Sequence, residues 1–148
     1  MRLAKFFILA LIVLGVTAMS SQGQTIDPRT LPVQMISAEE LKAKVTDNQA
    51  LTIIDVRSSE GYAASSSTIK GAMHFKLRRL KSRLLRAPLK DLPKDREIVT
   101  YCACPNDESS IAAAQIFQES GFKRVKVLQG GWQEWLKAKG PVAPRPKS

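Results

Sequence analysis

The stretch "IVTYCACPNDESSIAAAQIF", residues 98–117, decides the fold and contains the only two cysteines of the chain, Cys102 and Cys104. Its first part is apolar and rich in β-branched residues, which is typical of a strand buried on both faces. Its last part places apolar residues at helical spacing. The stretch therefore predicts a strand over 97–102, a loop that carries both cysteines, and a helix that begins near residues 109–110.

The same alternation of strands and helices continues on both sides of this stretch. Ser37 and Glu40, three residues apart, form a capping box that predicts a helix beginning at Ala38. Further runs predict strands over 50–56, 71–75 and 124–131 and helices over 77–89 and 132–140. This alternation predicts an α/β fold with a mostly parallel central sheet and helices on both faces. Ligands of such folds bind beyond the carboxyl ends of the strands, which is where Cys102 falls.

The first 23 residues have the pattern of an export signal. Arg2 and Lys5 precede an apolar run of 11 residues, 6–16, whereas a membrane-spanning helix needs about 20. We expect a signal peptide over 1–23 and export to the periplasm, with no stable membrane span after cleavage. An uncleaved anchor is the alternative. The remaining chain divides into a linker over 24–32, one domain over 33–140 and a flexible tail over 141–148.

The charge of the chain is strongly basic, with 23 Lys and Arg against 13 Asp and Glu and a net charge of +10. A basic surface raises the local concentration of anions, although such charge also serves solubility alone. No basic motif interleaved with aromatic residues is present, so we expect no nucleic-acid partner. The basic run over 76–86 is interpreted as the solvated face of a helix, with steering of anionic donors or a protein partner as the alternative.

The two cysteines have three candidate roles. A disulfide between residues one apart closes too small a ring to stabilise the fold much. Zinc needs three or four protein ligands, and His74 is the only histidine, so we expect no metal site. A thiol before a helix start is the third reading, because free N–H groups there lower the pKa of Cys102 from about 8.5 toward neutrality and hold anions. The competing reading is a buried and inert cysteine.

Four segments, in order, resemble the rhodanese-like sulfurtransferase family over about residues 33–140. The segments are "IIDVRSSEGYAA" (53–64), "TIKGAMHF" (68–75), "IVTYCACPNDESSIAAAQIF" (98–117) and "GFKRVKVLQGGWQEW" (121–135). The resemblance implies a central, mostly parallel sheet of about five strands flanked by helices. It also implies transfer of a sulfane sulfur from thiosulfate or a persulfide to a thiol, a cyanide-type acceptor or a protein, without a cofactor.

The resemblance assigns roles to individual residues. Cys102 matches the cysteine that carries the persulfide, an example of covalent catalysis in two steps. Asp55 and Arg57 match a pair that we expect to brace the active-site loop. The backbone of the loop is expected to cradle the substrate and the negative persulfide through Ala103, Cys104, Pro105, Asn106, Asp107, Glu108 and Ser109.

The loop departs from the commoner family pattern, roughly Cys-x-x-Gly-x-Arg-Ser. Pro105 removes one N–H donor, and Asp107 with Glu108 stands near the usual arginine. The two acids either repel an anionic donor and raise the pKa of the thiol, or cap the helix start. Related phosphatases and arsenate reductases grip their oxyanion with an arginine, which this loop lacks. Thr68 stands where the family often has histidine.

Cys104 is a candidate resolving thiol or a protector of Cys102 against overoxidation, and its competing reading is a loop side chain without a role. A rival function follows, namely a non-catalytic or redox-sensing rhodanese-like module that uses the cysteine pair. His74 is interpreted as a strand residue rather than a base. Trp132 and Trp135 are expected to pack the last helix on the sheet.

Overall fold

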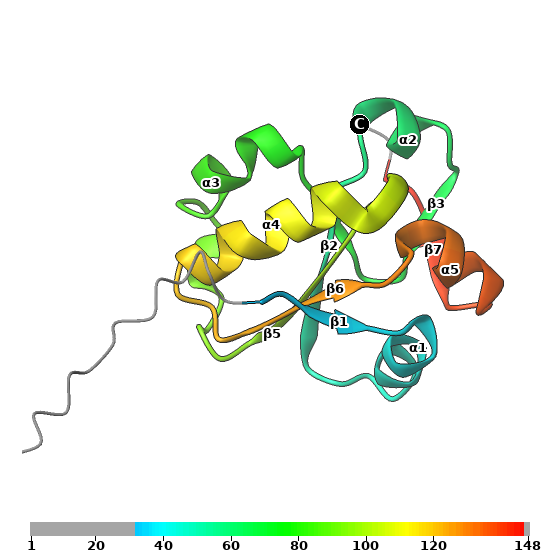
Figure 1. Cartoon of the computed structure of the whole chain (residues 1–148), viewed down its shortest axis with the longest axis horizontal. Helices are drawn as coiled ribbons and strands as arrows, with labels where there is room; N and C mark the ends of the chain where they lie inside the picture. Colours follow the sequence, from blue (N-terminus) through cyan, green and yellow to red (C-terminus); the bar gives the residue numbers. More distant parts are fainter. Residues whose placement is uncertain (1–31, 147–148) are drawn as a thin grey trace, which may run out of the picture.

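The computed structural model describes residues 32–146 (Figure 1). The expected signal peptide and all but the last residue of the expected linker, 1–31, lie outside the described residues, as do residues 147–148. Among the residues that the structure describes, no helix is both long and apolar enough to cross a bilayer.

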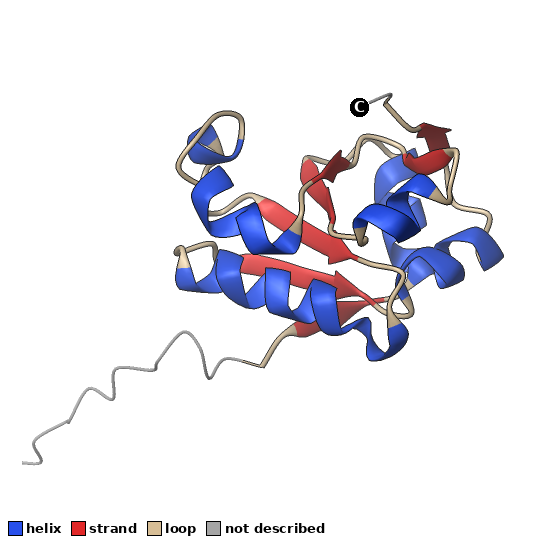
Figure 2. Cartoon of the chain, turned by 90° about the horizontal axis from the view of Figure 1, so that it is seen from above, coloured by secondary structure: helices blue, strands red, loops and turns tan. Residues whose placement is uncertain are grey.

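A five-stranded parallel sheet forms the centre of the molecule. Its strands, in spatial order, are β1 (Gln34–Ile36), β6 (Arg124–Leu128), β5 (Glu97–Tyr101), β2 (Leu51–Asp55) and β4 (Met73–His74). Figure 2 shows the longer strands side by side and pointing in one direction. All five residues of β5 are buried because β2 and β6 flank the strand and helices cover both faces. The predicted parallel α/β sheet is confirmed.

Two separate cores lie on the two faces of the sheet. Neighbouring residues of one strand point to opposite faces, so Ile98 joins one core and Val99 the other. The first core lies under α4 (Glu108–Glu119) and α3 (Leu80–Arg83). The second lies under α1 (Ala38–Thr46) and α5 (Gly131–Lys137), with Trp132 and Trp135 both buried in it. Helices therefore cover both faces, and the two tryptophans pack the last helix as expected.

The local signals for α1 and α4 match the structure closely. The Ser37 hydroxyl accepts a hydrogen bond of 3.1 Å from the backbone N–H of Glu40 and caps the start of α1 as predicted, whereas the Glu40 carboxylate pairs with Lys126 instead of returning to Ser37. The helix α4 begins at Glu108, one or two residues before the expected start, and the chain leaves it at Gly121 with a φ of +88°. Glycine adopts this left-handed backbone without the steric cost that a side chain brings.

The segment over 77–89 is not the single helix that the leucine spacing predicts. It forms the short 3₁₀ helix η2 (Leu77–Arg79) and then α3, and a further 3₁₀ helix, η3 (Leu89–Asp91), follows. Leu80 and Leu89 are fully buried, whereas Leu85 is 76% exposed. The chain bends between the two buried leucines because a straight helix cannot bring both of them into one core.

The expected flexible tail over 141–148 is partly a strand. Residues Val142–Pro144 form β7, which pairs antiparallel with β3 (Ser67–Ile69) in a separate two-stranded sheet beside α2 (Ser59–Ala63) (Figure 1). The backbone of Arg145 extends this pairing with a hydrogen bond of 2.9 Å to Ser66. The prediction of a loose tail is therefore wrong for these residues, because the serine-rich segment offers them a backbone partner.

Candidate active site

Cys102 directly follows β5, at the carboxyl end of the central strand, and its side chain is almost wholly buried (1% exposed). Its carbonyl oxygen accepts a hydrogen bond of 2.8 Å from the backbone N–H of Trp132. A Cβ added to Gly131 falls only 2.2 Å from this oxygen, so only glycine permits the approach of the two loops. The Gly130–Gly131 pair at the start of α5, the glycine turn, therefore fixes the backbone of the cysteine.

The two cysteine sulfur atoms are bonded to each other in this structure. The Cys102 sulfur also accepts a hydrogen bond of 3.4 Å from the backbone N–H of Cys104 and lies 3.6 Å from the Ser110 hydroxyl oxygen. The Cys104 sulfur accepts a hydrogen bond of 3.4 Å from the backbone N–H of Ser109, in the first turn of α4. Each sulfur thus faces a backbone donor, which favours its negatively charged form when the bond is reduced.

A small cavity of about 90 Å³ opens beside the cysteines and is lined by Ser58, Gly61, Cys102, Ala103, Cys104 and Ser109. Three members of the predicted cradle, Ala103, Cys104 and Ser109, therefore line it together with Cys102. The other four, Pro105, Asn106, Asp107 and Glu108, are not among its lining residues. The remaining lining residues are Gly61 in α2 and Ser58, which directly precedes this helix. Neither of them was identified from the sequence as part of the site.

The contacts of the two acids in the loop do not indicate that they repel a substrate. The Asp107 side chain is buried, and its carboxylate accepts a hydrogen bond of 2.8 Å from the backbone N–H of Gly130. Asn106 and Asp107 both have left-handed backbones, a conformation that Asn and Asp tolerate better than most residues. Glu108 is exposed at the first position of α4, where a negative charge is favourable. Asp107 thus ties the cysteine loop to the glycine turn.

Asp55 and Arg57 form a buried ion pair below the loop. The Arg57 guanidinium donates to both Asp55 oxygens, with the shortest distance 2.7 Å, and also to the carbonyl of Ser67 at 3.1 Å. The guanidinium carbon lies 4.4 Å from the centre of the Trp132 ring. Because the Trp132 backbone holds the Cys102 carbonyl, the ion pair contacts the loop through this tryptophan.

Tyr101 and Thr68 complete the environment of Asp55. The Tyr101 hydroxyl donates to the Asp55 carboxylate at 2.7 Å, and the Thr68 hydroxyl donates to the same oxygen at 3.1 Å. Burial and, after it, the negative charge of Asp55 raise the pKa of Tyr101. Thr68 therefore fills the position of the usual histidine as a partner of the buried carboxylate. The role of Tyr101 is not visible in the sequence pattern.

His74 does not line the cysteine cavity. Its ring stacks on Tyr62, with the ring centres 3.7 Å apart, and its Nε2 lies 3.1 Å from the carbonyl oxygen of Arg57. The His74 ring therefore packs and forms a hydrogen bond at the edge of the sheet. The interpretation of this histidine as a strand residue agrees with its place in β4.

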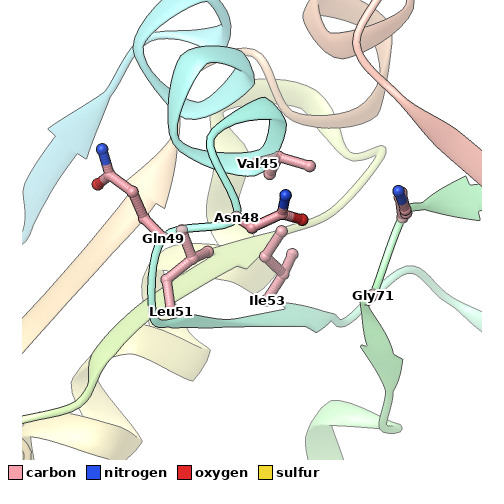
Figure 3. A pocket seen from close by; sticks show the side chains of 7 residues that line it. Val45, Asn48, Gln49, Leu51, Ile53 and Gly71 are labelled. Carbon is pink, nitrogen blue, oxygen red and sulfur yellow. The ribbon is translucent and has the colours of Figure 1, made fainter.

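Two further hollows lie at different distances from the cysteines. One, of about 450 Å³, shares Ser58 and Ser109 with the cysteine cavity, and its lining includes Lys76 and Arg78 with a single acid, Glu60. Backbone and Ser58 hydrogen bonds lower the pKa of this acid. The other hollow, of about 230 Å³, lies near the amino end of β2, whereas Cys102 lies at the carboxyl ends of the strands. Its lining residues are Val45, Asn48, Gln49, Leu51, Ile53, Lys70 and Gly71 (Figure 3).

Comparison with known proteins identifies the family. A sequence model of the Rhodanese-like domain matches residues 37–138. A sulfurtransferase of Allochromatium vinosum is 26% identical over 110 residues, which cover 74% of this chain and 94% of that protein. YrkF of Bacillus subtilis is 32% identical over 100 residues, but the chain spans only about half (49%) of its length. The chain belongs to the rhodanese-like domain family.

The solved structures agree with this assignment. The Alr3790 protein of Anabaena superposes with a TM-score of 0.62 at 31% sequence identity, over 74% of this chain and 81% of that one. The expected family is thus confirmed, and sulfur transfer is supported at the level of the family.

Proposed function

We propose that this protein is a sulfurtransferase that carries sulfur as a persulfide on Cys102. The observation that carries the proposal is the position of the Cys102 sulfur at the tip of the central strand, beside a backbone N–H and the Ser110 hydroxyl and on the wall of a small cavity. The backbone donor favours the thiolate, which is the nucleophilic form of cysteine, whereas the Ser110 hydroxyl donates its proton to the carbonyl of Asp107. A relative named as a sulfurtransferase supports the transfer of sulfur.

The transfer has two steps once the cysteines are reduced. The Cys102 thiolate attacks the outer sulfur of thiosulfate, the sulfur–sulfur bond of the donor breaks, and sulfite leaves. A nucleophilic acceptor such as cyanide or a thiol then attacks the outer sulfur of the persulfide, and the Cys102 thiolate leaves. The intermediate divides one transfer into two displacements at the same sulfur.

The loop stabilises the charge that this chemistry builds up. The backbone N–H groups of Cys104 and Ser109 face the sulfur atoms, and dipoles held in place before the reaction lower the energy of a developing anion. Asp107 and the Asp55–Arg57 pair act as positioning residues, because they hold the loop through the glycine turn and through Trp132.

The hollow beside the cavity supports a small anionic donor. Lys76 and Arg78 are exposed on its wall, and two of its lining residues also line the cysteine cavity. Two positive charges on the wall of this neighbouring hollow raise the local concentration of anions such as thiosulfate. The same surface is available to a protein that accepts the sulfur.

Export to the periplasm is part of the proposal and rests on the sequence over 1–23. Thiols tend to pair in oxidising compartments, so an exported protein of this sequence is expected to form the Cys102–Cys104 bond.

The test is the formation of thiocyanate from thiosulfate and cyanide by the reduced protein. Cys102→Ser is expected to remove the activity, while Lys76→Ala with Arg78→Ala raises the KM for thiosulfate several-fold and leaves kcat nearly unchanged. Arg86→Ala with Lys90→Ala is the matched control, because these two exposed cations line neither hollow. Activity that survives the loss of the Cys102 thiol refutes the proposal.

A second candidate function is a redox-sensing module without turnover, which the bonded pair favours. This function predicts that the reduced protein forms no thiocyanate and takes up no sulfur from any sulfane donor, while mild oxidation restores the Cys102–Cys104 bond.

A further inference from the structure

The second cysteine has no part in the two displacements described above, yet it is bonded to the first. We propose that Cys104 resolves the Cys102 persulfide and releases the outer sulfur as hydrogen sulfide. The protein then has a further activity, the reductive release of sulfide from sulfane sulfur with a dithiol as the reductant. This inference rests on the proposed persulfide at Cys102.

The loop accommodates the product of this reaction. The two sulfur atoms are bonded, with the Cα atoms 5.6 Å apart, which is within the usual range for disulfides. In this bonded state the Cys102 carbonyl still accepts the Trp132 N–H at 2.8 Å, so the bond is compatible with the anchored end of β5. Cys104 is therefore within reach of the atom that it has to attack.

The surroundings of Cys104 favour its reactive form. The N–H of Ser109 points at its sulfur from the first turn of the twelve-residue helix α4. A donor and a helix start both stabilise a thiolate. Cys104 is also already part of the cavity wall, whereas an external acceptor must first enter a space of about 90 Å³. An intramolecular attack has the advantage of proximity over an external one.

The atoms balance as follows. The Cys104 sulfur attacks the inner sulfur of the persulfide on Cys102, and a Cys102–Cys104 bond forms. The bond between the inner and outer sulfur breaks, its electron pair goes to the outer sulfur, and the outer sulfur leaves as HS⁻ with the proton of the persulfide, because Cys104 attacks as a thiolate. The outer sulfur is reduced and the two cysteines are oxidised. A dithiol then reduces the disulfide and is itself oxidised to a disulfide.

Regeneration also has a preferred direction. Cys104 is half-buried, while Cys102 is 1% exposed, so an external thiolate reaches the Cys104 sulfur more readily. Attack there expels the Cys102 thiolate, which is the leaving group that the Cys104 N–H faces. The cycle therefore returns the nucleophile in the form that accepts the next sulfur.

The experiment loads reduced protein with one equivalent of thiosulfate without oxygen, removes sulfite by gel filtration, and follows intact mass and free sulfide. The wild type is expected to release about one sulfide per chain and to end two hydrogen atoms lighter than the reduced protein. Cys104→Ser and Cys104→Ala are expected to retain the extra sulfur at least about tenfold longer and to release sulfide only when a dithiol is added.

The outcomes separate this inference from the proposed function. Extra sulfur that persists equally in the wild type and both Cys104 variants overturns the inference and leaves the persulfide intact. A disulfide that forms without an equivalent of sulfide also overturns it. Failure of the Cys104 variants to take up any sulfur overturns the persulfide itself, and the inference with it.

Discussion

Replacing Gly131 by alanine tests whether the glycine turn fixes the backbone of Cys102. The added Cβ falls 2.2 Å from the Cys102 carbonyl oxygen, a backbone atom that cannot rotate away. Gly131 also has a φ of +51°, which costs an alanine about 1–2 kcal/mol. Loss of the Trp132–Cys102 hydrogen bond adds about 1 kcal/mol, and crowding of the two loops adds about 1–3 kcal/mol. The expected loss of stability is therefore about 3–6 kcal/mol.

Gly121→Ala is the matched control. Gly121 has a φ of +88°, but a Cβ there meets nothing within 4 Å, so only the backbone cost of about 1–2 kcal/mol applies. Urea unfolding of both variants in the reduced state measures the difference. At about 4 °C per kcal/mol, thermal unfolding is expected to fall by about 12 °C or more for Gly131→Ala and by about 4–8 °C for the control. Equal losses in the two variants refute the reasoning.

Three further predictions concern the residues around the loop. Asp107→Ala removes the buried, charged acceptor of the Gly130 N–H and is expected to cost about 1.5–3 kcal/mol in urea unfolding. Asp107→Asn keeps an oxygen acceptor and is expected to cost less. Equal costs for the two variants contradict this role of Asp107. Asp55→Asn leaves the buried Arg57 charge without its counterion and is expected to cost about 3–5 kcal/mol, so a cost below about 1 kcal/mol contradicts a buried pair. Above a pH of about 10 the phenol of Tyr101 ionises in the unfolded chain but stays neutral in the folded protein, because its pKa is raised there. Its contribution to stability is therefore complete below that pH and falls by about 1.4 kcal/mol per pH unit above it. Tyr101→Phe is expected to lose this part of the alkaline slope in denaturation curves, and an unchanged slope contradicts the assignment.

The central part of the fold follows from local sequence signals. Continuous β-branched runs predict β2, β5 and β6, and the capping box at Ser37 predicts the start of α1, because these signals act within one element. β1 and β7 have three residues each and expose much of their surface, so neither has a periodicity to read. Their pairing partners decide them, and these partners lie far away in the sequence.

The candidate site shows the same division. The position of Cys102 at a strand end follows from the pattern of residues 98–117, since strand, loop and helix are contiguous there. The partner of Asp107 is Gly130, 23 residues further on, and no local rule connects the two. The sequence therefore does not decide whether the acids of the loop repel a donor or cap a helix. Asp107 instead binds the backbone of Gly130.

The leucine spacing over 77–89 is the clearest case in which a local pattern misleads. Leu77, Leu80 and Leu84 lie at helical intervals, and the chain is helical only in short pieces. The burial of Leu80 and Leu89 in one core outweighs the stabilisation that further helical turns offer.

The most direct measurement of the central claim is the location of the transferred sulfur. Reduced protein is treated with thiosulfate that carries an isotopic label in its outer sulfur, and the label is located by peptide mass spectrometry in the wild type, Cys102→Ser and Cys104→Ser. The account predicts that the Cys104→Ser protein holds the label on Cys102 and delivers it to cyanide as labelled thiocyanate. Label retained by the Cys102→Ser protein, or no label in either variant, contradicts it.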